Sequence, residues 1–344
     1  MQPTVGRIAD RETNGRGPCR VCDRPSSFRP VVPGQSRRKH HRVRISVIMP
    51  AFNEEAGIST VLGALTESSD FGPDVEIIVA ANGCTDRTAV VARSFGVRVI
   101  EIPTPSKTAA LNAADPVATG DVVVYMDADV PADMRLIRLL AAAVREPGVG
   151  AAVPRPVVDA SVSSWPVRSF YAINARLPVF KGRLFGRGVV AVSREARSRF
   201  ASFPEITADD MFLDASVPAA EKVEVGATVR VMAPRTAGDL IRRVARARDG
   251  NAEFWRYVEA TPGFSPDPVA GPSATSWLRD VLLKAPWLLP SAVVYVSIIL
   301  LAERKRRSKT WDVRSGWGRT TPATVAVKVP GQRQPVEDRA NQLH

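Results

Sequence analysis

The chain has 344 residues, of which 45% are hydrophobic and 24% charged, so it can fold around a sizeable core. Its three cysteines are too few for a disulfide scaffold and suit a reducing compartment. The net charge of +12 lies in the flanks: residues 1–44 hold eleven basic and three acidic residues, and residues 303–320 hold seven and two. Basic flanks around a nearly neutral core favour an anionic membrane surface over nucleic acid as the partner.

Residues 1–43 are predicted to be a disordered basic tail, because they are rich in Pro and Arg and show no apolar period. Cys19 and Cys22 form a single CxxC pair in this tail, and His40 and His41 follow. A zinc site there is the weaker interpretation, since no second CxxC exists and adjacent histidines lack the spacing of zinc fingers.

From residue 44, short apolar runs alternate with segments of helical spacing. We predict strands at 44–52, 75–83, 97–103 and 121–129, each followed by a helix. Such alternation indicates a mostly parallel sheet covered by helices, that is, a Rossmann-like α/β fold. Right-handed crossovers then bring the strand ends to one edge, where open α/β sheets bind ligands.

The second half of the chain is less regular. We predict a strand at 150–159, a helix at 163–180, a strand-to-helix unit at 186–200, a short helix within 205–217, and a basic amphipathic helix or helix pair at 237–260.

Asp127 and Asp129 follow the apolar run VVVYM at the end of the fourth predicted strand. Carboxylates are costly to bury unless they are paired or bind a cation. Mg²⁺ and Mn²⁺ take one or two such carboxylates together with substrate phosphates, so a metal site is one interpretation. The other is that the strand ends there and both acids face water.

Several familiar sites are excluded. The first strand is followed by PAFNEE rather than GxGxxG, and GRGVVA at 186–191 runs into a strand, the wrong context for a dinucleotide fingerprint. No GxxxxGK[ST] phosphate loop occurs. The histidines are His40, His41 and His344, so a base in the folded domain should be a carboxylate.

Five segments in order carry a resemblance to a known family. They are VIMPAFNEE, VAANGCTDRT, KTAALNAA, MDADV and TADDMFL. Together they resemble the inverting family 2 glycosyltransferases of the GT-A fold, over roughly residues 44–250. The resemblance implies a glycosyltransferase domain at 44–260, of a membrane-associated bacterial type. Its activity would be transfer of a sugar from a nucleotide-sugar donor to a hydroxyl of a lipid-linked or polysaccharide acceptor, with inversion and with Mg²⁺ or Mn²⁺.

The resemblance also implies which residues hold the nucleotide sugar. Pro50, Glu54, Asn82 and Asp86 would contact the base and ribose. The family often has an acid pair where Ala81 and Asn82 stand; Asn82 can still hydrogen-bond a base edge, although Asn82–Gly83 also fits a plain turn.

The resemblance also implies which residues contact the diphosphate, hold the metal and act as the catalytic base. Lys107 and Asp127 would approach the diphosphate. Alternatively, Lys107 is simply a solvated residue at the start of a helix. Asp127 and Asp129 would hold the metal. Asp210 would be the catalytic base and Asp209 its neighbour; alternatively, both are acids at a helix start, where the helix dipole favours them.

The segment RRVARA stands where the family has QxxRW. Arg243, Arg246 and Ala247 would occupy the Gln, Arg and Trp positions, and the two arginines could clamp phosphate. An equally good interpretation is an arginine-rich helix that lies on lipid headgroups.

Residues 285–302 form an uncharged apolar run at the lower length limit for crossing a bilayer, and the basic ERKRRSK follows. We predict membrane contact here, at the cytoplasmic face, and leave open whether the run spans, re-enters or lies on the membrane. Residues 261–284 are predicted to be a linker or amphipathic segment, and 303–344 a disordered basic tail.

Two other functions fit parts of the pattern. A non-catalytic nucleotide-binding module of the same fold would suit Ala81 and the altered RRVARA. A metal-dependent nucleotidyltransferase would also use Asp127 and Asp129, but no Gly/Arg-rich phosphate loop follows the first strand.

Overall fold

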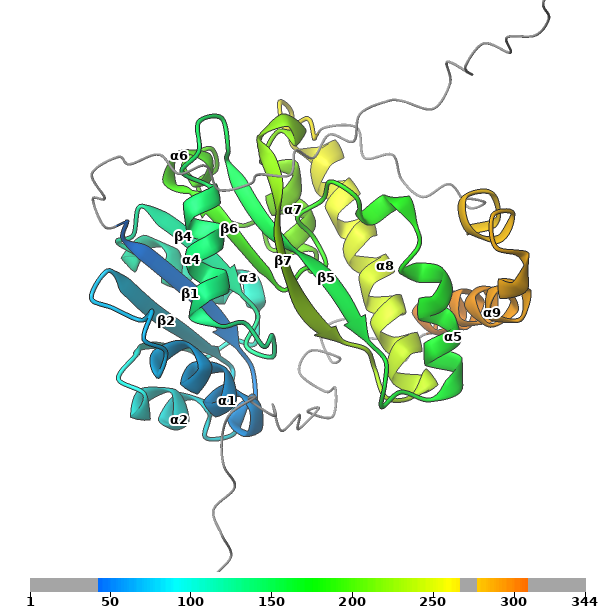
Figure 1. Cartoon of the computed structure of the whole chain (residues 1–344), viewed down its shortest axis with the longest axis horizontal. Coiled ribbons are helices and arrows are strands. Elements are labelled where there is room, and N and C mark those ends of the chain that lie inside the picture. Colours follow the sequence, from blue (N-terminus) through cyan, green and yellow to red (C-terminus); the bar gives the residue numbers. More distant parts are fainter. Residues whose placement is uncertain (1–42, 267–276, 309–344) are drawn as a thin grey trace, which may run out of the picture.

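A seven-stranded sheet runs through the centre of the computed structural model, which describes residues 43–266 and 277–308 (Figure 1). The strands are β1 (Ile45–Ala51), β2 (Val75–Asn82), β3 (Arg98–Ile102), β4 (Val122–Met126), β5 (Ala151–Asp159), β6 (Val189–Ser193) and β7 (Lys222–Met232), in the order β3-β2-β1-β4-β6-β5-β7. β6 runs antiparallel to β4 and β5, and the other neighbouring pairs are parallel. The predicted mostly parallel α/β fold is confirmed.

Nine α-helices connect or follow the strands in the described part of the chain. They are α1 (Glu55–Thr66), α2 (Thr88–Ser94), α3 (Lys107–Ala114), α4 (Met134–Ala143), α5 (Trp165–Asn174), α6 (Arg194–Arg197), α7 (Asp209–Ala215), α8 (Ala237–Ala260) and α9 (Leu289–Arg306). Side chains fix several of the starts: Ser106 accepts the Ala109 N–H before α3, and Thr236 accepts the Asp239 N–H before α8. Residues 237–260 form one helix, not a pair.

The two faces of the sheet carry separate cores because strand side chains alternate between them. On one face, Val47 and Met49 of β1 pack with α1 and α4. On the other, Ile48 packs with Leu111 of α3, Phe212 of α7 and residues of α8. The helices α3, α7 and α8 are thereby held on one side of the sheet, next to the carboxyl ends of β1 and β4.

Strand β7 was not predicted, although its sequence contains a clear signal. Val223, Val225, Val229 and Val231 alternate with other residues, which is typical of a half-buried strand. β7 pairs in parallel with β5, with an irregularity in register between Val153 and Arg155. It forms the edge of the sheet beside α8, and its end contributes to the candidate site.

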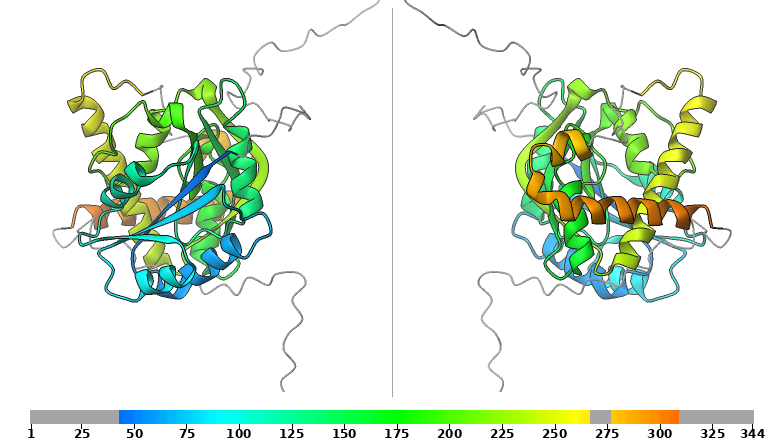
Figure 2. Two further views of the ribbon diagram at one scale, coloured as in Figure 1. Left: turned by 90° about the vertical axis from the view of Figure 1, so that its left-hand side faces the viewer. Right: turned by 90° about the vertical axis from the view of Figure 1, so that its right-hand side faces the viewer.

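The carboxy-terminal apolar run is a helix, α9, and it packs across α5 and α8 (Figure 2). It continues to Arg306, so residues 303–306 are helical and not part of a tail. In the described residues, Pro286–Arg306 is the one helix long and apolar enough to cross a membrane. Within the predicted 261–284 linker, Trp277–Leu282 forms a π-helical turn.

The predicted tail at 1–43, apart from Val43, lies outside the described residues, and so do residues 309–344 of the tail predicted at 303–344. The Cys19/Cys22 pair, for which a zinc site was the weaker interpretation, also lies outside them.

Candidate active site

The ends of β1 and β4 and the starts of α3 and α7 surround one cavity of about 310 Å³. The predicted site residues that line it are Pro50, Lys107, Asp127, Asp129, Asp209, Asp210, Arg243 and Arg246. These come from segments far apart in the sequence, and parallel strand ends bring the first four to one edge, as expected.

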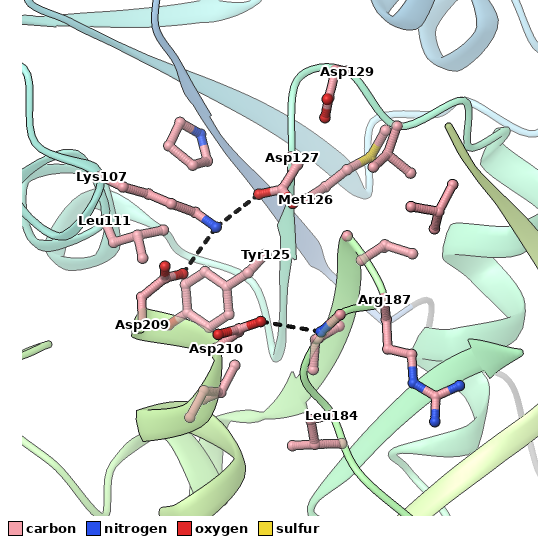
Figure 3. A pocket seen from close by; sticks show the side chains of 18 of the residues that line it. Lys107, Leu111, Tyr125, Met126, Asp127, Asp129, Leu184, Arg187, Asp209 and Asp210 are labelled. Atoms are coloured by element: carbon pink, nitrogen blue, oxygen red, sulfur yellow. Dashed lines mark hydrogen bonds and ion pairs between the residues drawn. The ribbon is translucent and has the colours of Figure 1, made fainter. Parts of the chain in front are cut away.

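Lys107 joins the two acid groups of the cavity (Figure 3). Its Nζ lies 2.8 Å from Asp127 Oδ1 and 2.9 Å from Asp209 Oδ2. Burial alone would lower the pKa of Lys107, but the charges of Asp127, Asp209 and Asp210 raise it well above its usual value. The ammonium group is therefore a fixed positive charge between the end of β4 and the start of α7.

Asp127 and Asp129 differ in their surroundings. The Asp127 N–H donates to Gly188 O at 2.8 Å, which ties the end of β4 to the loop before β6. Asp129 is open to solvent yet stands within the cleft, where desolvation and then the charge of Asp127 raise its pKa. The negative charge of Asp127 acts on Asp129, and a cation bound beside both carboxylates would offset this repulsion.

The donor set at this strand end fits a divalent metal. Across residues 43–266 and 277–308, no three Asp, Glu, His or Cys side chains form a complete metal-binding cluster. Asp127 and Asp129 would thus supply two hard oxygen ligands and leave the remaining positions to phosphate oxygens and water, as is usual for Mg²⁺.

Asp209 and Asp210 begin α7 but are held differently. Asp209 is buried, and that burial, with the charges of Asp210 and Asp127, raises its pKa from 3.8 to about 6 although Lys107 opposes the shift. Asp210 accepts hydrogen bonds from Gly186 N at 3.0 Å and Met211 N at 2.9 Å. Asp209 is thus a partner of Lys107, and Asp210 faces the cavity with its carboxylate oriented by backbone donors.

The loop at 183–188 is a part of the site that the sequence reasoning missed. Gly186 (φ 70°) donates to Asp210, and Gly188 (φ 69°) accepts from Asp127. A Cβ on Gly188 would lie 2.4 Å from Val130 Cγ2, so only glycine fits there. The two glycines of GRGVVA therefore let this loop approach Asp127 and Asp210 closely. From the sequence, these glycines were considered only as a possible dinucleotide fingerprint, so this role was missed.

The buried carboxylate of Asp214 holds the same loop in place. Leu184 N donates to Asp214 Oδ1 at 2.7 Å, and Arg183 lies 3.4 Å from Asp214 Oδ2. Lys222, whose side chain is fully buried, places its Nζ 2.9 Å from Asp214 Oδ1. α7, β7 and the loop are thus joined at one point.

Glu54, Asn82 and Asp86 lie outside the cavity lining. Asn82 is fully buried, and its Nδ2 donates to Ala51 O at 3.0 Å, so it links β2 to β1. Asp86 accepts from Thr88 N at 3.0 Å at the start of α2. Their nucleotide-binding roles stay predictions.

The negative charges of the cavity acids act on the carboxyl group of Glu54. Burial and then Asp129, Asp86 and Asp127 raise the pKa of Glu54 from 4.5 to about 7. This places Glu54 on the acidic side of the site even though it does not line the cavity.

Basic side chains from α8 and β7 also line the cavity. Arg243 and Arg246 project from α8 into the cavity, and Arg230 and Met232 from the unpredicted β7 stand beside them. Arg243 Nη1 donates to Met232 O at 3.2 Å, and burial followed by the charge of Arg243 lowers the pKa of Arg246. Both arginines line the cavity, and their phosphate-binding role stays a prediction.

Part of the chain is similar to known proteins. Residues 46–195 match the family model described as Glycosyl transferase family 2. Over 94 residues the chain is 38% identical to a glucosyl-3-phosphoglycerate synthase from Mycobacterium tuberculosis, covering 25% of this chain and 29% of that protein. Over 128 residues it is 30% identical to an N-acetylglucosaminyltransferase from Rhizobium meliloti, covering 35% and 30%. The chain thus spans less than a third of the length of these curated relatives.

One solved structure shares the fold over most of the chain. It is a mannosyltransferase from Pyrobaculum calidifontis in complex with GDP-Man and Mn²⁺, with a TM-score of 0.53, 24% identity and coverage of 75% of each chain. The predicted GT-A fold is confirmed by this likeness.

Proposed function

We propose, from the premise that residues 46–195 form a glycosyl transferase family 2 domain, that this protein transfers a sugar from a nucleotide-sugar donor to a hydroxyl group. The observation that carries the proposal is one cavity lined by Asp127, Asp129 and Asp210, in which Lys107 bridges Asp127 to Asp209, the neighbour of Asp210. An acid pair, a fixed cation and a separate carboxylate are the groups that such a transfer needs.

The donor would bind with its diphosphate near Lys107 and the arginines of α8. When bound, Mg²⁺ or Mn²⁺ would be held by Asp127 and Asp129 and would neutralise charge on the diphosphate. The mannosyltransferase of the same fold, which was solved with GDP-Man and Mn²⁺, supports this choice of metal. Lys107 and Arg246 would supply further positive charge close to the departing group.

Asp210 would act as the base. Its carboxylate takes the proton of the acceptor hydroxyl as that oxygen forms a bond to the anomeric carbon. The bond from the anomeric carbon to the diphosphate breaks, and its electron pair leaves on the diphosphate oxygen. Attack opposite to the leaving group inverts the anomeric centre. Gly186 N and Met211 N orient Asp210 for this step.

We further propose that the acceptor is a lipid-linked or polysaccharide hydroxyl and that the protein works at the cytoplasmic face of the cell membrane. The support is the apolar α9 and the basic residues that follow it. Cell-envelope polysaccharide assembly is the class of reaction that this placement suits.

A panel of nucleotide sugars, each with Mn²⁺ or Mg²⁺, tests the proposal. We expect one donor to raise the melting temperature and to be turned over slowly in water without an acceptor. Donor binding without turnover under any acceptor condition would favour a non-catalytic nucleotide-binding module. Release of diphosphate from a nucleoside triphosphate would favour a nucleotidyltransferase.

A further inference from the structure

Helix α9 has an inward face that belongs to the core of the protein. Ile298 is buried in a cluster with Phe170 of α5 and Leu240 of α8. The ring of Tyr295 stacks on Phe170 with centroids 5.0 Å apart. Ala292 is buried in a neighbouring cluster. Because α9 packs across α5 and α8 (Figure 2), removing it would expose these apolar side chains to solvent.

The outward face of α9 is apolar as well. Leu289, Val293, Leu300 and Leu301, here called the α9 stripe, are 48–64% exposed in the described structure. Leu289, Val293 and Leu300 lie on one side of the helix, and Leu301 lies about 100° around the helix from Leu300. The exposed Ser297 stands between Val293 and Leu300 on this side. Trp287, just before the helix, is 75% exposed. Isolated exposed apolar residues are ordinary, but several large ones gathered on the outer side of one helix indicate a contact surface.

Basic residues stand at both ends of the α9 stripe. Lys284 precedes it, and Arg304 and Arg307 follow it, all of them exposed. An apolar row bounded by cations, with a tryptophan at one end, is typical of helices that lie in a membrane interface. The charges complement anionic phospholipid headgroups, and this complementarity selects a bilayer over an apolar protein partner.

We propose that α9 lies in the plane of an anionic membrane surface, with the α9 stripe in the acyl boundary, and does not cross the bilayer. A crossing helix would have to leave α5 and α8 and expose Phe170 and Leu240. The apolar run 285–302 is also at the lower length limit for crossing. The inference rests on the proposed membrane placement and is independent of the proposed sugar transfer.

Docking in this way would place the candidate active site at a fixed height above the bilayer. On α8, Leu240 packs against α9, and Arg243 and Arg246 on the next turns line the cavity. One rigid helix therefore connects the membrane-facing layer to the cavity. A lipid-linked acceptor would meet the site without any change of domain arrangement.

Flotation of the full chain with vesicles tests the surface. We expect binding to vesicles that contain phosphatidylglycerol, weaker binding to pure phosphatidylcholine, and a loss with rising salt. The double variant Leu289→Glu/Leu300→Glu should reduce binding by at least about tenfold, since two exposed leucines no longer enter the bilayer. Val90→Glu is the matched control, because Val90 is 53% exposed on α2, and it should bind like the wild type.

Labelling distinguishes lying on the membrane from crossing it. In a variant whose three cysteines are replaced by serine, Lys284→Cys and Arg307→Cys are introduced one at a time. With inside-out membrane vesicles, an impermeant maleimide should label both positions. Labelling of only one end would show a crossing helix and overturn the in-plane geometry, while leaving membrane attachment intact.

Two other outcomes would overturn the docking itself. One is a wild-type chain that fails to float with either kind of vesicle. The other is a soluble dimer that Leu289→Glu/Leu300→Glu converts to a monomer, which would make the α9 stripe a contact between copies. Turnover of the nucleotide sugar in detergent-free solution is scored separately, so failure of docking and failure of the proposed transfer can be told apart.

Discussion

Asp210 and Asp214 lie four residues apart on α7 and hold the same loop from the same side of the helix. Asp210 accepts from Gly186 N, and Asp214 accepts from Leu184 N. The acid proposed as the base and the buried acid one turn further on are therefore two attachment points of one structural unit.

Removing the charge of Asp214 should destabilise the protein. Asp214→Asn leaves the buried Lys222 without its carboxylate, which typically costs roughly 3–5 kcal/mol. The double variant Asp214→Asn/Lys222→Met should recover part of this loss. Denaturant unfolding measures both, and a double variant no more stable than Asp214→Asn would mean that Lys222 is not the dominant partner.

Asp210→Asn should lower turnover by roughly 10²–10⁴-fold while nucleotide-sugar affinity stays similar, because the amide cannot accept the proton. Steady-state kinetics and donor titration check the two parts. Glu205→Gln is the control, since Glu205 is exposed near α7 and away from the cavity lining. If Asp209→Asn lowers turnover more than Asp210→Asn does, the roles of the two acids are reversed.

Asp129→Ala should abolish sugar transfer and leave the fold intact. Asp129 is open to solvent and its pKa is raised, so its ionised form is disfavoured in the folded state and its removal should not lower the melting temperature at neutral pH. The variant should also lose Mn²⁺ binding, which calorimetry measures independently of activity. Wild-type transfer by this variant, or by the wild type in excess chelator, would contradict a role for metal.

Glu54 should make stability depend on pH. Its pKa is raised to about 7, so its contribution to stability is fully present below its unfolded pKa near 4.5 and is lost as pH rises through 7. Glu54→Gln should therefore be more stable than the wild type by about 1–3 kcal/mol near pH 8, the range being lowered because Glu54 is only half-buried. Unfolding is followed in EDTA, so that no cation occupies the acids, and equal stabilities near pH 8 would refute the raised pKa.

Gly188→Ala should lower the free energy of unfolding by more than the backbone strain of a positive φ alone would. Gly148 has φ 78° and nothing within 4 Å of a built Cβ, so Gly148→Ala isolates the backbone strain of about 1–2 kcal/mol. Gly188→Ala adds a clash with Val130 and should disturb the loop that holds Asp127. Unfolding free energies of the two variants are compared directly, and equal losses would show that the Val130 side chain simply moves aside.

Local patterns were sufficient to predict the elements of the sheet edge that carries Asp127 and Asp129. The run VVVYM has to be a buried strand, and a parallel strand ends where ligands bind. The pairing of Lys107 with Asp209 could not be predicted in this way, because it depends on where α7 packs. That position is set by tertiary contacts of Phe212 and by the Asp214 anchor, neither of which has a short sequence signature.

Two other parts of the site were missed for different reasons. The alternation in β7 was present in the sequence and overlooked, and with it Arg230. The roles of Gly186 and Gly188 depend on approach between two loops, which the GRG letters do not specify. The sequence also did not indicate that the Nδ2 of Asn82 donates to Ala51 O of β1, a contact that depends on the pairing of β2 with β1.

The packing of α9 onto α5 and α8 also has a consequence for the order of events during synthesis. Because synthesis runs from the amino terminus, α5 and α8 leave the ribosome before α9, while a domain generally folds as a unit. Until α9 has been made, Phe170 and Leu240 lack the side chains of α9 that bury them, so apolar surface on α5 and α8 stays exposed in the growing chain. The last helix of the described structure thus covers the surface on which a nascent chain would aggregate, so chaperone demand should be greatest just before residues 289–306 emerge.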